Sequence, residues 1–253
     1  MHTHFKVLAA AFLLLTSGTV LAQDPEVSER DQLKITALEA MISAPEEQAL
    51  PRVRKVLEGN NSDHVKASAL FILSHMDHPD AQTLLLDTAR TSSGRLQVEA
   101  IRMIGVGGNP QALSQLRGLY ETGDNNVRSA VMEAYLISDD VEGVLDIART
   151  TTNDREFALA VEMLAAMDAT EELRSLNLEG RPEMSETLIK AYIITDDHES
   201  LKKLAMDGSN PDRQVDAIEA LGIVDGPGTD TTLVEIYKGS DDRDIRSAAM
   251  HGL

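Results

Sequence analysis

The sequence predicts an all-α protein, and more closely a right-handed α-solenoid built from successive helix pairs. Three observations lead to this fold class. Only 3% of the 253 residues are aromatic and none is Trp, which disfavours a β-sandwich or β-barrel packed on aromatic side chains. Apolar residues recur at the spacing of one helix face. The same pattern returns about every 28 to 32 residues, which is the period expected of a helix-pair repeat.

The N-terminal segment is predicted to be a cleaved signal peptide. Lys6 precedes an apolar run over residues 7–15, and Val20 and Ala22 then put small or moderately small residues just before Gln23. A transmembrane helix needs about 20 apolar residues, and this run is shorter. We therefore expect cleavage after Ala22 and a mature protein that is periplasmic or secreted.

A flexible leader is expected after the signal peptide, over residues 23–30. This stretch contains Pro25 and charged side chains but no apolar stripe, so burial cannot offset the entropy lost on ordering it. The repeat array is expected from Asp31 to Leu253. Because the pattern stops in the middle of a helix pair, we expect the array to be incomplete at Leu253 or to continue beyond it.

Equivalent positions mark the first helix of each predicted pair. They are Leu33, Val65, Leu96, Val127, Glu156, Met184, Arg213 and Ile245. Four residues further on, six of these eight helices carry Ala, and a larger apolar residue follows each time. A small residue at a fixed point lets neighbouring helices approach closely, so each first helix should stack on the next.

The second helix of each pair is predicted from a further apolar stripe after a polar or glycine-bearing turn. Turns such as 138–140 and 195–197 carry paired Asp residues, which favour helix caps. Calcium binding is the alternative use of these turns, but they lack the EF-hand pattern. The stripes contain Leu84, Leu85 and Ala89; Leu113, Leu116 and Leu119; Val144, Leu145 and Ala148; Leu173 and Leu176; Leu201 and Leu204; and Leu233, Val234 and Tyr237.

Three tracts at the first-helix positions resemble the signature of HEAT-like repeats, the type also found in phycobilisome lyases. These tracts are Asn126–Ala134, Val215–Gly222 and Ile245–Met250. The resemblance extends from about Asp31 to Leu253 and implies a solenoid whose second helices line a concave surface. It implies no particular activity.

The charge and the lack of Cys exclude several classes of function. The formal net charge is −19, and since Lys6 is the one fully charged residue in the signal peptide, cleavage leaves 22 basic and 42 acidic residues, or −20. Nucleic acid and anionic membranes are therefore disfavoured as partners. Without Cys there is no disulfide, thiolate metal site, Fe–S cluster or thiol nucleophile. We expect a basic or neutral protein or peptide as the partner.

The densest group of candidate metal ligands is His75 and His78 together with Asp77 and Asp80. A His-x-x-His spacing can hold zinc or copper, but a catalytic zinc needs a third protein ligand, and the remaining histidines of the array belong to other repeats. Turn histidines are more often simply solvated. We therefore predict no catalytic, metal or cofactor site, and leave open whether His75 and His78 bind a metal.

The sequence thus favours an exported, non-catalytic scaffold or adaptor that binds a protein or peptide on its concave face. The alternative is a repeat or regulatory segment of a longer exported enzyme whose catalytic domain lies beyond residue 253. An enzyme within this chain is disfavoured, because no catalytic constellation is present. The expected contact residues are acidic side chains of the second helices: Glu142, Asp146, Glu171, Glu172, Glu199 and Glu235.

Overall fold

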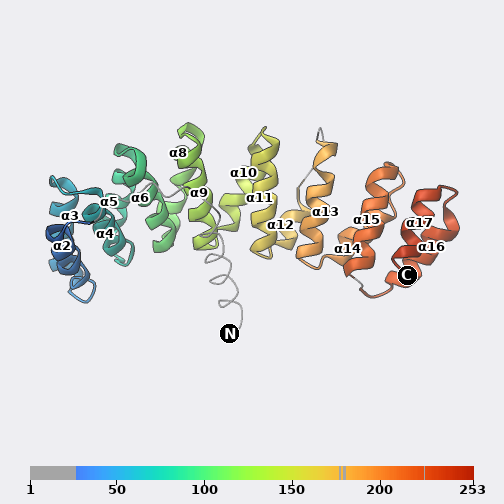
Figure 1. Ribbon diagram of the computed structural model, residues 1–253, viewed down its shortest axis with the longest axis horizontal. Coiled ribbons are helices and arrows are strands. Elements are labelled where there is room, and N and C mark those ends of the chain that lie inside the picture. The colour runs from blue at the N-terminus through green and yellow to red at the C-terminus, as the bar shows by residue number, and fades with distance from the viewer. Residues whose placement is uncertain (1–26, 177, 179–180, 225) are drawn as a thin grey trace. The chain divides into compact units, whose positions relative to one another are not determined.

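A computed structural model describes residues 27–176, 178, 181–224 and 226–253 (Figure 1). Its regular structure over these residues is helical and contains no strand, which confirms the all-α prediction. None of these helices is both long and apolar enough to cross a bilayer. The expected signal peptide and the first half of the expected leader, residues 23–26, lie outside the described residues. The chain forms two compact units, Met1–Gly143 and Val144–Leu253, with the boundary inside one helix.

The first unit consists of helix pairs that pack in chain order. Each first helix contacts the next first helix: α4 contacts α6, and α6 contacts α9. The second helices α3, α5 and α8 pack on the first helices that follow them. The bounds are α2 (Glu29–Glu39), α3 (Glu46–Glu58), α4 (Asp63–Ser74), α5 (Pro79–Thr91), α6 (Gly94–Gly107), α7 (Pro110–Leu113), α8 (Leu116–Thr122), α9 (Asn125–Ser138) and α10 (Val141–Thr150), the last of which contains the unit boundary.

The second unit repeats this arrangement. Contacts again join successive first helices, α11 to α13, α13 to α15 and α15 to α17, while α14 and α16 pack on the first helices that follow them. The bounds are α11 (Asp154–Ala166), α12 (Thr170–Arg174), the 3₁₀ helix η2 (Pro182–Met184), α13 (Ser185–Ile194), α14 (His198–Ala205), α15 (Pro211–Val224), α16 (Thr229–Gly239) and α17 (Arg243–His251).

Burial follows the predicted apolar stripes of the first helices. In α4, for example, Ala69, Leu70 and Leu73 are fully buried. In the outermost helix of the second unit, Ala249 is buried whereas Met250 is exposed. The stripe therefore forms the core in the helices that have a neighbour on both sides.

Three boundaries differ from the sequence prediction. Helix α2 begins at Glu29 rather than near Asp31, because the Ser28 hydroxyl accepts a hydrogen bond from the Asp31 amide and caps the helix. The expected second helix around Leu113 and Leu116 is two short helices, α7 and α8, separated by a tight turn. The expected helical residue Leu176 lies beyond α12, which ends at Arg174.

Successive first helices approach most closely at small residues. A Cβ added to Gly105 of α6 would lie 2.6 Å from the Cα of Ala134 of α9. In the second unit, a Cβ added to Gly222 of α15 would lie 2.7 Å from the Cα of Gly252, which caps α17. Both contacts join the same two positions of the repeat. First helices therefore approach closely at small residues, but at other positions of the repeat than the recurring Ala from which close stacking was predicted.

The paired Asp residues of the turns serve as helix caps. Asp139 and Asp196 have φ values of 57° and 56°, in the left-handed region that often ends a helix, and Gly108 occupies the same repeat position with φ 61°. The second Asp of each pair caps the following helix: Asp140 accepts from the Gly143 amide, and Asp197 performs the same role in the second unit. The turns therefore have the capping geometry expected from the sequence.

Asp139 gives a direct test of this turn geometry. Replacing Asp139 with Val should lower the free energy of unfolding by about 1–2 kcal/mol, because a β-branched side chain is strained at positive φ. Asp139→Gly should maintain or increase it, since Gly adopts this conformation freely. Urea unfolding followed by circular dichroism compares the two. Equal stabilities of the two variants would contradict the assignment.

Candidate binding groove

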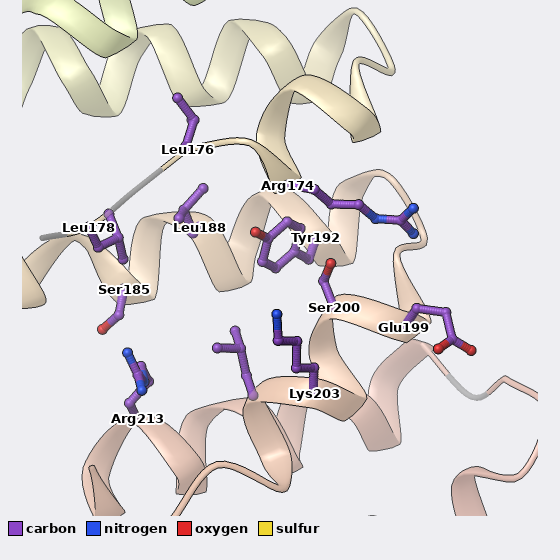
Figure 2. Close-up of a pocket in the computed structure, with 11 residues that line it drawn as sticks. Arg174, Leu176, Leu178, Ser185, Leu188, Tyr192, Glu199, Ser200, Lys203 and Arg213 are labelled. Carbon is purple, nitrogen blue, oxygen red and sulfur yellow. The ribbon is translucent and has the colours of Figure 1, made fainter. Parts of the chain in front are cut away.

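A groove with a volume of about 690 Å³ lies within the second unit, between α12, α13, α14 and the start of α15 (Figure 2). Four leucines supply its apolar lining: Leu176, Leu178, Leu188 and Leu204. Leu188 is buried in the stripe of α13, and Leu204 belongs to α14. Leu176 reaches the groove because α12 is short and the chain leaves the helix before this residue. The early end of α12 therefore adds Leu176 to an apolar lining that α13 and α14 also supply.

Arg174 lies at one end of the groove, where an ion pair with Asp197 holds it in place. The Arg174 guanidinium donates to both carboxylate oxygens of Asp197 at 2.6 and 2.8 Å, and also to Glu171 at 2.7 Å. The Asp197 side chain is completely buried, whereas that of Arg174 is 37% exposed. Its carboxylate also accepts from the Ser200 amide as the cap of α14. This bidentate pair fixes the end of α12 to the start of α14.

The pKa values at this end follow from the same contacts. Burial opposes ionisation of Asp197, but hydrogen bonds from Arg174 and Ser200 outweigh it and lower the pKa of that carboxyl. The hydrogen bond to Asp197 raises the pKa of Arg174 further. Burial, followed by the charge of Asp197, raises the pKa of the neighbouring Tyr192 phenol. Arg174 and Asp197 are therefore charged, and Tyr192 neutral, at pH 7.

A second cation, Lys203, extends into the middle of the groove. Figure 2 shows its ammonium group directed toward the space beside Tyr192 and Ser200. Glu199 lies one turn earlier on α14, at a spacing that often gives an ion pair, yet its carboxylate points away and no ion pair joins these two side chains. Lys203 thus offers an ammonium donor to the groove.

Arg213 of α15 forms the other end of the groove. Its guanidinium donates to the Asp207 carboxylate and, at 3.1 Å, to the Ser209 hydroxyl. Hydrogen bonds from Ser209, with a smaller contribution from Arg213, lower the pKa of Asp207. Arg213 Nε is buried and has no hydrogen-bond acceptor among the described residues. Ser185 lies nearby and adds a hydroxyl to this end (Figure 2).

The structure places the six acidic residues expected at the binding face on second helices α10, α12, α14 and α16, and it leaves five of them exposed, with Glu172 half-buried. Glu171 is paired with Arg174, and Glu199 lies at the groove, 3.9 Å from Nδ1 of His198. Glu235 borders a smaller cavity of about 440 Å³ beside α16. These acidic residues therefore occur one or two to a helix along α10, α12, α14 and α16.

The two candidate metal-binding histidines, His75 and His78, both contact backbone groups through Nδ1. Nδ1 of His75 lies 2.9 Å from the Phe71 carbonyl oxygen, and the two rings pack together. The amide of Asp80 donates to Nδ1 of His78, which caps α5. Within the described ranges, no group of three or more His, Asp or Glu side chains is arranged to hold a metal ion.

The sequence interpretation missed the groove because its parts are far apart in the chain. Arg174 and Asp197 belong to different helix pairs, 23 residues apart in the sequence. One signal was present in the sequence: Lys203 follows Glu199 at ion-pair spacing. Only the structure shows that the two side chains diverge.

No protein-family model matches the chain, and no curated protein sequence resembles it at a significant level.

Proposed function

We propose that this chain is an exported, non-catalytic scaffold of HEAT-like repeats that binds a basic or neutral protein or peptide along its second helices. Export is inferred from the N-terminal sequence, with cleavage after Ala22 and a periplasmic or secreted location. The solenoid form is inferred from the repeated packing inside each unit, where every interior first helix contacts the first helices on both sides. Such arrays commonly present extended surfaces to other polypeptides.

The observation that carries this proposal is the accessibility of acidic side chains on successive second helices. Glu142, Glu171 and Glu199 lie in the first turns of α10, α12 and α14, where a negative charge also complements the helix dipole. Glu235 lies further along α16 and is exposed. Together with the chain's net charge of −19, these residues would attract a basic partner from solution.

Charge reversal on second helices tests this proposal. An extract of exported proteins is passed over the immobilised chain, and the association rate of each captured protein is measured at increasing salt. Because exposed charges are screened over about 8 Å at physiological ionic strength, association should slow steeply with salt while dissociation changes less. The double variant Glu142→Lys with Glu235→Lys should slow association several-fold.

The matched variant changes the same charge elsewhere. Glu162 and Glu219 are exposed on the first helices α11 and α15, so reversing both to Lys alters the net charge equally but leaves the second helices intact. This variant should slow association much less. A strongly acidic captured partner, or association rates indifferent to salt, would overturn the proposal.

A further inference from the structure

We infer that the groove between α12 and α15 is a second binding site, which takes a short peptide segment with an Asp or Glu side chain flanked by leucine-like residues. This ligand has the opposite charge to the partner proposed for the second helices, and the inference does not depend on that proposal. Three features of the groove support it: the hydrogen-bond donors of its lining, the lack of an ion pair at Lys203 among the described residues, and the positions of the polar and apolar side chains.

The polar lining of the groove is rich in hydrogen-bond donors. Arg174, Lys203 and Arg213 are cationic and can only donate through their side-chain nitrogens, and the serine hydroxyls can donate as well. Glu199 is the one carboxylate among the lining residues described. The carboxylates that hold the two arginines in place, such as the buried Asp197, are not part of the lining. A ligand in the groove therefore encounters donors and must supply acceptors.

No carboxylate among the described residues pairs with the central cation, Lys203. Lys203 forms no ion pair with any residue in the described part of the chain, although Glu199 is within reach on the same helix. A ligand carboxylate beside Lys203 would form a charge-assisted hydrogen bond, with the Ser200 hydroxyl as a further donor nearby. The carboxylate of an acidic side chain fits this donor set.

The apolar lining favours apolar residues beside the acidic residue of the ligand. Leu176 and Leu188 lie on the side of the groove opposite Lys203, so apolar side chains of a ligand can pack there while its acid meets the ammonium (Figure 2). Polar groups occur at both ends of the groove and in its middle, so an apolar side chain bound there lies close to a donor. The volume of about 690 Å³ is within the range of sites for small ligands, and suits a few peptide residues.

Selection from a randomised octapeptide library tests this inference. The library is screened against the immobilised full chain, and the peptides recovered are expected to share an acidic residue next to Leu or Ile. One recovered peptide is then labelled and its dissociation constant measured by fluorescence anisotropy. Lys203→Gln should weaken binding by about tenfold or more, because it removes a hydrogen bond between two charged groups. Replacing the peptide's acid by its amide should have a similar effect.

Lys238→Gln provides the matched control, because Lys238 is exposed on α16 and does not line the groove. It should change the affinity by less than about twofold. The inference is overturned if no peptide is enriched, if the enriched peptides are basic, if both lysine variants weaken binding equally, or if dodecanoate displaces the peptide as effectively as an acidic peptide does. Reversal of Glu142 and Glu235 should leave peptide affinity unchanged, so this test and that of the proposed scaffold function can fail separately.

Discussion

Replacing Gly105 with Ala should destabilise the first unit by about 1–3 kcal/mol, near the upper end of that range. The added Cβ would lie 2.6 Å from the Cα and 2.7 Å from the carbonyl oxygen of Ala134, and backbone atoms cannot rotate out of its way. Helices α6 and α9 would have to separate, which weakens the contact that joins two helix pairs. Ala134→Leu should act at the same contact, since Ala134 is fully buried. Urea unfolding at pH 7 measures both losses.

Gly118 is the control for this prediction. It lies inside α8 in the same unit, and a Cβ added there would meet no atom within 4 Å. Gly118→Ala should therefore stabilise the chain by about 0.4–1 kcal/mol, because Ala restricts the unfolded state without a clash. If both Gly variants shifted the unfolding midpoint in the same direction, the close approach of α6 and α9 would be wrong.

The repeat could be predicted from the sequence because it is a local pattern of apolar residues that recurs in each helix pair. The stripe in each first helix is fixed by residues only a few positions apart, so Ala69, Leu70 and Leu73 are buried as expected. Small residues at fixed points also indicated close stacking. Which pairs of small residues meet could not be predicted, because that depends on the angle between helices. The Gly105–Ala134 contact is known only from the structure.

The groove could not be predicted because it depends on where one helix stops. The spacing of Leu173 and Leu176 suggested a continuous helix, but α12 ends at Arg174, and Leu176 becomes part of the groove wall. The number and type of charges on the second helices were visible in the sequence, whereas the direction of each side chain was not. The acidic composition of the chain therefore gave no indication of a groove rich in cationic donors.

Arg174→Met should have the largest effect on the second unit, with a loss of about 2–4 kcal/mol in the free energy of unfolding at pH 7. The variant keeps the length of the side chain but leaves the Asp197 carboxylate, which is fully buried, without its bidentate partner. The loss should be below that of a fully buried pair because Arg174 itself is partly exposed. Arg149 makes a comparable contact to the neutral Ser175 hydroxyl at an exposed site, so Arg149→Met should cost less than about 0.5 kcal/mol.

The deficit of Arg174→Met should depend on pH in a defined direction. In the wild-type chain the pKa of Asp197 is lowered, so its contribution to stability is present above the unfolded-state pKa of about 3.9 and is lost as the pH falls through the folded-state value. Without Arg174, burial of the carboxylate should dominate and raise the pKa of Asp197. Protonation would then relieve the buried charge, and the difference in unfolding free energy between variant and wild type should shrink from pH 7 toward pH 4. Arg174→Met combined with Asp197→Asn should recover part of the loss at pH 7 and remove most of this pH dependence. A deficit that stayed constant across this pH range would show that the ion pair does not hold α12 and α14 together in the way the geometry indicates.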